Sequence, residues 1–145
     1  MAHQLPQVTR IYQNHHLDSV RWERYEPRDD DVVISTSYKS GTTWMQMIVS
    51  NLVFGIENAP RPIMEVSPWI DSRSRPLDGV VRRLELQRHR RFIKTHLPLD
   101  GLPYYPQVKY IVVGRDARDV GMSLWNHYSN YTDAFYDRLN STPAR

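Results

Sequence analysis

Residues 32–44 read VVISTSYKSGTTW, and this segment has the most informative pattern in the chain. A short β-branched run, typical of a strand, leads into a small polar turn that holds one lysine and one glycine. Apolar residues at helical spacing follow at Met45, Ile48, Val49 and Leu52. Gly55 stands where a helix of this length would end. The sequence therefore predicts a strand, a tight turn and a helix in direct succession.

A turn of this kind predicts an anion site. The first backbone N–H groups of a helix lack partners within the helix, and they carry the positive end of its dipole. Lys39 adds a positive charge, and Ser40, Thr42 and Thr43 add hydroxyl groups around Gly41. Capping of the helix beside a solvated lysine is the alternative for a single Ser or Thr. The crowding of these five residues favours a phosphate or a similar oxyanion.

The order of these residues differs from the common P-loop, because Lys39 precedes Gly41 and the first glycine is absent. Residues 36–44, TSYKSGTTW, resemble instead the 5′-phosphosulfate loop of the cytosolic-type sulfotransferases, which usually reads TYPKSGTTW. The match departs at Ser37 and Tyr38, where the family has Tyr-Pro. Losing the proline makes the turn less pre-set but leaves the donor-bearing residues in place.

A second segment, KTHLP at residues 94–98, follows a predicted short strand over 91–95. The turn places Lys94 and His96 at the carboxyl end of that strand, where ligands of open α/β sheets bind. A lone histidine in this position is more often structural. The segment resembles the KTHLP motif of the same family without a mismatch. The resemblance implies that His96 is the catalytic base and that Lys94 contacts the sulfonate.

A third segment begins with residues 108–113, which read as a buried strand. A turn follows, and Asp116 is a predicted N-cap for a helix through Tyr128. Arg115 and Ser123 could both bind one phosphate. Alternatively, Arg115 could form an ion pair with Asp116 or Asp119. Residues 115–123, RDARDVGMS, resemble the 3′-phosphate segment of the family, which favours the role of Arg115 and Ser123 as phosphate ligands.

The predicted fold is α/β, a three-layer αβα arrangement with a parallel sheet. The expected elements are β(32–36), α(42–54), α(79–90), β(91–95), β(108–114), α(116–130) and a helical piece over 132–139. Strands followed by helices imply helices packed on the faces of the sheet. The resemblance implies a P-loop nucleoside-kinase-like fold. A single domain is expected over residues 1–145, with a polar N-terminal segment over 1–31 and a core over 32–140.

The resemblance covers residue 29 to about residue 140, which corresponds to the first half of the family domain. A later glycine-rich, basic segment that closes over the nucleotide is missing. The domain is therefore expected to be truncated, with an exposed sheet edge through which the chain can associate with itself.

The composition of the chain excludes several kinds of site. The chain has 145 residues, a formal net charge of +3 and no cysteine, which excludes disulfides and thiolate metal sites. The charge suits a polyanionic small ligand but is too mild to demand nucleic acid. No apolar run is long enough for a membrane span or a signal sequence, so the chain is expected to be cytoplasmic. His15 and His16 are expected at the surface, pointing in opposite directions along an extended chain.

Two segments have open interpretations. Residues 58–78 form a proline-rich loop whose apolar residues either join the core or line a pocket for an apolar acceptor. Those residues are Ile63, Met64, Val66, Trp69 and Ile70. Basic residues between Arg82 and Arg91 are expected to form a solvated face, with steering of an anionic ligand as the alternative.

The family resemblance implies sulfonate transfer from 3′-phosphoadenosine-5′-phosphosulfate to the hydroxyl or amine of a small acceptor with an apolar body. In that reaction Lys39 would neutralise charge on the leaving phosphate, Trp44 could stack on the adenine, and no metal is needed. Two alternatives stay open. One is a truncated, non-catalytic nucleotide-binding fragment, and the other is a P-loop nucleotide kinase. A kinase would need a carboxylate for magnesium, and Asp116 is the residue that the sequence offers.

Overall fold

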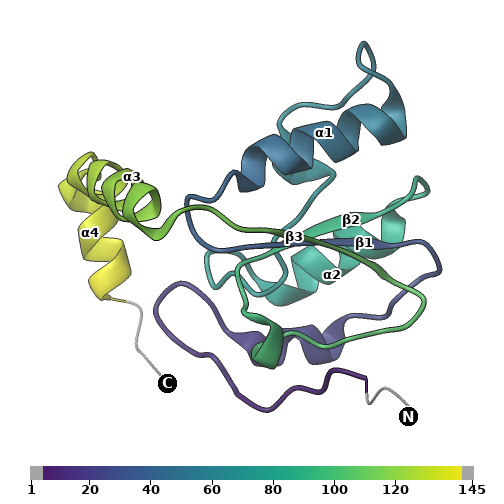
Figure 1. Ribbon diagram of the computed structural model, residues 1–145, viewed down its shortest axis with the longest axis horizontal. Coiled ribbons are helices and arrows are strands. Elements are labelled where there is room, and N and C mark those ends of the chain that lie inside the picture. The colour runs from purple at the N-terminus through teal and green to yellow at the C-terminus, as the bar shows by residue number, and fades with distance from the viewer. Residues whose placement is uncertain (1–4, 142–145) are drawn as a thin grey trace.

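A computed structural model describes residues 5–141 of the chain. Its centre is a parallel three-stranded sheet in the order β2-β1-β3 (Figure 1). The central strand β1 spans Val32–Thr36, and its neighbours β2 and β3 span Phe92–Thr95 and Lys109–Val113. Because all three strands run the same way, their carboxyl ends meet at one edge of the sheet.

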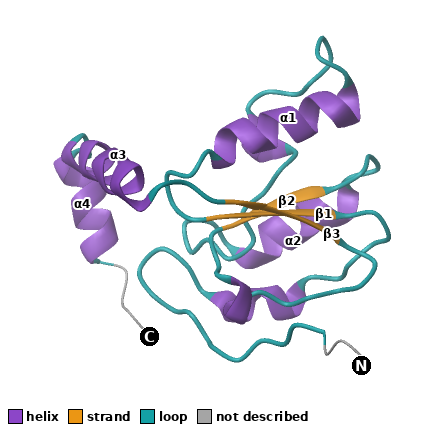
Figure 2. Cartoon of the chain, in the orientation of Figure 1, coloured by secondary structure: helices purple, strands orange, loops and turns teal. Residues whose placement is uncertain are grey.

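The strands and helices occur along the chain in the predicted order (Figure 2). The helices are α1 (Thr42–Phe54), α2 (Leu77–Leu86), α3 (Ala117–Ser129) and α4 (Asp133–Asn140). Short 3₁₀ turns lie at η1 (Ser19–Arg24), η2 (Ile63–Glu65) and η3 (Leu99–Gly101). The largest difference from expectation is at α2, which ends four residues earlier than predicted because Gln87 adopts an extended backbone conformation.

The sheet is covered on both faces, which confirms the three-layer α/β architecture. Val32 and Ile34 of β1 pack with Val49 of α1 on one face. Val33, between them, points to the other face, as alternation along a strand requires. That second face is covered by α2 and by the N-terminal segment, and Figure 1 shows α1 and α2 on opposite sides of the sheet.

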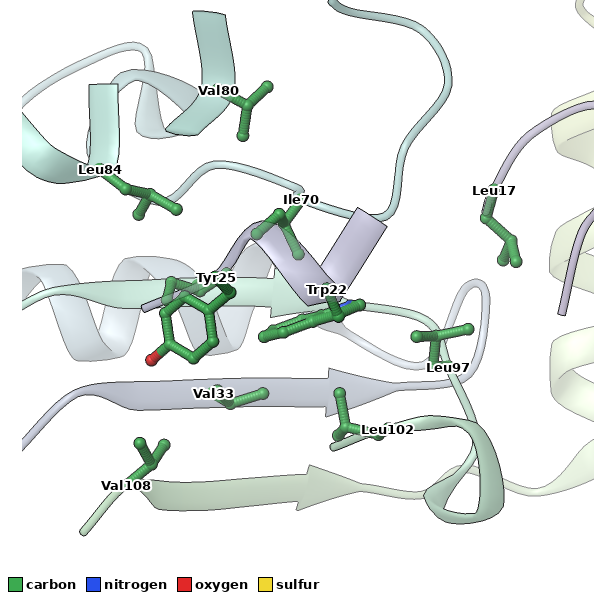
Figure 3. Packing of buried hydrophobic residues seen from close by; sticks show 11 residues of the cluster. Leu17, Trp22, Tyr25, Val33, Ile70, Val80, Leu84, Leu97, Leu102 and Val108 are labelled. Carbon is green, nitrogen blue, oxygen red and sulfur yellow. The ribbon is translucent and has the colours of Figure 1, made fainter. Parts of the chain in front are cut away.

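Part of the N-terminal segment, which the sequence predicts as a polar stretch ahead of a core over 32–140, packs into the hydrophobic core. Leu17, Trp22 and Tyr25 are buried against Val33 and its neighbours (Figure 3). The three residues lack helical or strand periodicity, so the sequence pattern did not predict their burial. The amide of Asp18 donates to the carbonyl of Asp71 at 2.8 Å, and this bond helps to hold the segment in place.

The apolar face predicted for α1 is only partly correct. Val49 is buried, but Leu52 is 81% exposed and Ile48 is also exposed. Gln46 is buried in their place, because its side-chain amide donates to the carbonyl and the hydroxyl of Ser67, at 3.0 and 2.9 Å. A satisfied polar side chain can thus occupy the inner face of a helix.

The prediction of a buried strand over 108–113 is wrong for most of its length. β3 pairs with β1 alone and forms an edge of the sheet, and Val112 is 74% exposed. The following helix α3, which is described throughout, has no buried residue. Figure 1 shows it beyond the carboxyl ends of the strands instead of on a face of the sheet.

A buried ion pair joins the starts of β1 and β2. The Arg91 guanidinium donates from Nε and Nη2 to the two carboxylate oxygens of Asp31, and the Nε bond is 2.9 Å long. Tyr25 Oη also donates to Asp31, at 2.7 Å. Arg91 was expected on a solvated basic face, so its burial corrects that expectation. The pair helps to hold the two strands side by side.

Candidate functional site

A cavity of about 1030 Å³ opens at the carboxyl ends of the strands, between the β1–α1 loop and the inner faces of α3 and α4. Every residue that the sequence singled out for the site lines it. These are Lys39, Ser40, Gly41, Thr42, Thr43, Trp44, Lys94, His96, Arg115 and Ser123. The parallel sheet accounts for the convergence, because the loop follows β1, Lys94 and His96 lie at the end of β2, and Arg115 follows β3.

The β1–α1 loop presents backbone amides to this cavity. Lys39 and Gly41 both have left-handed backbone conformations, with φ of 60° and 91°. At Gly41 an added Cβ would meet open space, so glycine is favoured there by the backbone angle and not by crowding. The hydrogen-bond ladder of α1 starts at Met45, whose backbone N–H donates to the carbonyl of Gly41. The amides ahead of it lack helical acceptors and can bind an anion.

The loop hydroxyls also hold the loop together. Ser40 is buried and its hydroxyl pairs with that of Ser37, while the Thr42 hydroxyl lies 2.5 Å from that of Thr36. Such hydroxyls can still accept or donate a further bond. Trp44, by contrast, is 81% exposed at the rim.

His96 is held in one tautomer. Its Nδ1 lies 2.9 Å from the backbone oxygen of Thr36, and a carbonyl only accepts, so Nδ1 carries the hydrogen. Nε2 then keeps its lone pair. Burial lowers the pKa of His96 to about 4, helped by the nearby positive charge of Lys94 and by His16. The imidazole is therefore neutral near pH 7 and able to accept a proton at Nε2.

Two aromatic rings flank His96. Tyr38 lies against the imidazole in a tilted arrangement, with ring centroids 4.4 Å apart and planes inclined at 32°. Trp69 meets it edge to face at 4.8 Å and 86°. The Trp69 indole N–H donates to Oδ2 of buried Asp71 at 2.7 Å, and the indole N–H of Trp22 donates to Oδ1 of the same carboxylate at 3.0 Å. Asp71 thus ties Trp69 to the core.

Lys94 lies over the face of Trp69, with Nζ 4.5 Å from the ring centroid, in a cation–π contact. Burial lowers the pKa of its ammonium group, and the charge of Asp71 opposes that shift. Burial also raises the pKa of Asp71 itself. The half-buried ammonium of Lys94 lacks a carboxylate at ion-pair distance in the described part of the chain, which leaves it able to bind an anion.

Arg115 has a structural contact in addition to its place in the cavity. Its Nη1 donates to the backbone oxygen of Lys39 at 2.9 Å, which fastens the end of β3 to the loop. Its Nε lies 3.8 Å from the carboxylate of Asp119. This is a long ion pair, and it is one of the two pairings that the sequence allowed for Arg115. Asp116 caps α3 and pairs with Arg118 instead. Ser123 is half-buried on the α3 wall.

Sequence reasoning missed the histidines of the rim. His15 and His16 were expected to point apart, yet their ring centroids are 4.2 Å apart, because the chain bends there instead of running extended. Both line the cavity, as does His127 of α3. The N-terminal segment reaches the site through an isolated bridge between Leu17 and Ser72, a long-range contact with no local sequence signal.

The apolar residues of the loop over 58–78 were expected either to join the core or to line a pocket, and the structure shows some of each. Ile70 is fully buried in the core under the sheet, and Ile63 and Val66 pack with the α1 side. Met64 and Trp69 line the cavity. The loop therefore supplies both core and pocket.

Across residues 5–141 the structure has no group of three or more histidine and acidic side chains placed to hold a metal ion. Over the same range no helix combines the length and apolarity that a membrane crossing requires.

A parallel α/β sheet with a loop and a helix N-terminus at the carboxyl ends of its strands is the arrangement at which many α/β proteins bind anionic ligands. Residues 29–141 match the family model described as the sulfotransferase domain. This match covers most of the chain, and the chain belongs to that family.

Three named relatives show the range of the similarity. A glycolipid sulfotransferase of Mycobacterium tuberculosis (strain ATCC 25177 / H37Ra) is 46% identical over 123 residues, which cover 85% of this chain and 38% of that protein. Sulfotransferase 1A1 of Rattus norvegicus is 38% identical over 69% of this chain and 36% of its own length. Sulfotransferase 1E1 of Homo sapiens is 33% identical over 71% of this chain and 37% of its own length. The chain thus spans under half the length of these relatives.

A solved structure shares the fold. Retinol dehydratase, in a complex with retinol and PAP, superimposes with a TM-score of 0.60 at 24% sequence identity, over 72% of this chain and 41% of that one.

Proposed function

We propose that this chain carries the donor-binding and proton-accepting part of a sulfotransferase site. The donor would be 3′-phosphoadenosine-5′-phosphosulfate, and the acceptor a hydroxyl or an amine. The observation that carries the proposal is the placement of neutral His96, with its Nε2 lone pair free of the Thr36 contact, in the same cavity as the Lys39 loop. A proton acceptor and an anion cradle are the two parts that such a transfer needs.

In the proposed reaction the acceptor oxygen or nitrogen forms a bond to sulfur as the bond from sulfur to the 5′-phosphate oxygen breaks. Nε2 of His96 takes the acceptor proton, a role that contributes about 10²–10⁴-fold in typical enzymes. Lys39 neutralises the charge that grows on the departing phosphate oxygen. Lys94 and the loop amides hold the charge of the sulfonate in transit, where preorganised donors are most effective.

The second phosphate of the donor would bind on the other wall of the cavity. Arg115 and Ser123 are proposed for the 3′-phosphate, and Trp44 for a stacking contact with the adenine. Arg115 would then serve two purposes, because its Nη1 is bonded to the Lys39 carbonyl while the rest of the guanidinium can donate to phosphate. Coupling of this kind would link occupancy of the 3′ site to the shape of the 5′ loop.

The acceptor is proposed to have an apolar body. Met64, Trp69, Phe135 and Leu139 supply apolar surface to the cavity. A second cavity of about 360 Å³ adjoins it, and Met64, Trp69 and Lys94 line both. The name of the mycobacterial relatives, glycolipid sulfotransferases, and the retinol bound by the structural neighbour agree with an apolar acceptor.

Calorimetry with two nucleotides tests the donor proposal. The chain is expected to bind 3′-phosphoadenosine-5′-phosphate more tightly than ATP, with and without magnesium, because separate anion sites serve its two phosphates. Equal affinities, or a preference for ATP that needs magnesium, would support the nucleotide-kinase alternative. A kinase would need Asp116 as a carboxylate for magnesium, and in the structure this exposed carboxylate forms an ion pair with Arg118.

A further inference from the structure

We propose that Tyr38 is a positioning residue that acts through His96, by fixing the plane of the imidazole and keeping water away from it. The inference rests on the proposed function, which makes His96 the proton acceptor. Tyr38 occupies the position at which the sulfotransferase loop usually has proline, a residue that could not supply this aromatic contact.

The two rings contact each other at an inclined angle. The Tyr38 and His96 centroids are 4.4 Å apart with planes inclined at 32°, so the tyrosine ring lies close against the imidazole. Trp69 contacts the imidazole edge to face, and Trp69 and Tyr38 also meet at 6.4 Å and 71°. Three rings therefore form one cluster, with His96 in contact with both of the others.

Each member of this cluster is anchored from a different element. Trp69 is held by its bond to Asp71, and His96 by its bond to Thr36. Tyr38 is fixed by the loop itself, since the residue that follows it has a left-handed backbone conformation. If Tyr38 were removed, the imidazole would keep its Nδ1 bond but could tilt about it, and water could reach the vacated face.

The tyrosine hydroxyl does not explain the placement. Tyr38 Oη is buried and has no hydrogen-bond partner within residues 5–141. Burial raises the pKa of this hydroxyl, with Asp71 as the next cause, so it stays protonated. An unpaired buried hydroxyl is a cost, and the favourable contribution must come from the ring. The substitution Tyr38→Phe should therefore leave the position and the protonation of His96 unchanged.

The charged and titratable groups that face His96 come from three elements. Lys94 lies on β2, His16 on the N-terminal segment and Tyr38 on the β1–α1 loop. Asp71 acts on Lys94 and Tyr38 and not directly on the imidazole. Since Tyr38 stays neutral, its effect on the proton affinity of His96 is exclusion of water. Opening that face should move the pKa of His96 up toward its ordinary value of 6.5.

Nitrogen-15 NMR of the imidazoles, between pH 5 and 8, tests the proposal on the 145-residue chain without any need for turnover. The His96 signals are assigned by comparison with His96→Gln. In the unchanged chain His96 should show the Nδ1–H tautomer and no titration above about pH 5.5. Tyr38→Phe should match it. Tyr38→Ala should give mixed tautomers and a titration inside the range, and Tyr38→Leu, which keeps bulk without the flat ring, should be intermediate.

An unchanged His96 tautomer and titration in both Tyr38→Ala and Tyr38→Leu would overturn the proposal. A change in Tyr38→Phe as large as that in Tyr38→Ala would also overturn it, because the hydroxyl would then be the active group. The indole signal of Trp22, which reports the buried core on the opposite side of Asp71, monitors folding in every variant. If the His96 behaviour follows Tyr38 while nucleotide binding fails, the positioning role stands and the sulfotransferase proposal alone is refuted.

Discussion

The buried ion pair between Asp31 and Arg91 offers a direct test of how the site is held. The side chains are 2% and 3% exposed, and the carboxylate also accepts from Tyr25 Oη and from the amide of Arg28, both within 2.9 Å. Asp31→Asn keeps the shape but removes the negative charge. The buried guanidinium is then uncompensated, which typically costs about 3–5 kcal/mol of folding free energy.

The assay is urea unfolding followed by tryptophan fluorescence, with the free energies taken by linear extrapolation. A matched control lies one residue away. Asp30 pairs with Arg90 at 3.3 Å and with Lys109 at 2.9 Å, and all three side chains are substantially exposed. Asp30 has a φ of 68°, which asparagine tolerates well. Asp30→Asn should therefore cost less than about 1 kcal/mol, as exposed pairs do.

A loss below about 1 kcal/mol for Asp31→Asn, or equal losses for the two variants, would refute the reasoning. The result bears on function because the pair sits where β1 and β2 start side by side. The register that it supports, Val32 opposite Phe92 through Ser35 opposite Thr95, also sets how the Lys39 loop lies relative to His96.

Three further predictions concern the site and the sheet edge. Lys39→Ala should weaken nucleotide binding and slow transfer together, whereas His96→Ala should keep nucleotide affinity within a few-fold and abolish transfer; unfolding of the His96 variant would instead identify a core histidine. The pKa of His96 is about 4 in the folded chain, against an ordinary value of 6.5 that applies to the unfolded chain. As pH falls, the imidazole is therefore protonated in the unfolded chain before it is protonated in the folded chain. Stability should therefore drop between pH 6.5 and 4, by up to about 3 kcal/mol at roughly 1.4 kcal/mol per pH unit, and His96→Gln should show a smaller drop in the same denaturation series. The exposed edge at β3 should make the 145-residue chain self-associate, and Val112→Lys should shift light-scattering masses toward the monomer; an unmodified chain that stays monomeric at all concentrations would contradict this.

Local patterns of residue type were enough to predict the order of strands and helices along the chain and the loops of the candidate site. The β-branched run before the loop, Gly41 at a left-handed position and the KTHLP segment each depend on neighbours within a few residues. Turn chemistry and helix starts are local by nature, because they depend on backbone angles and on the first unpaired amides. Parallel strands then bring their carboxyl ends together, so Lys39, His96 and Arg115 could be expected at one edge.

Tertiary structure decided what surrounds those residues. Trp69 and Tyr38 flank His96 from positions 27 and 58 residues before it in the chain, as the sequence numbering shows. His16 reaches the rim because Leu17 pairs with Ser72, and Asp71 joins Trp22 to Trp69 across the core. None of these contacts leaves a periodic trace in the sequence. Burial of a side chain depends on which distant segments pack over it, so the apolar pattern of a strand such as β3 cannot show that one of its sides stays open to solvent.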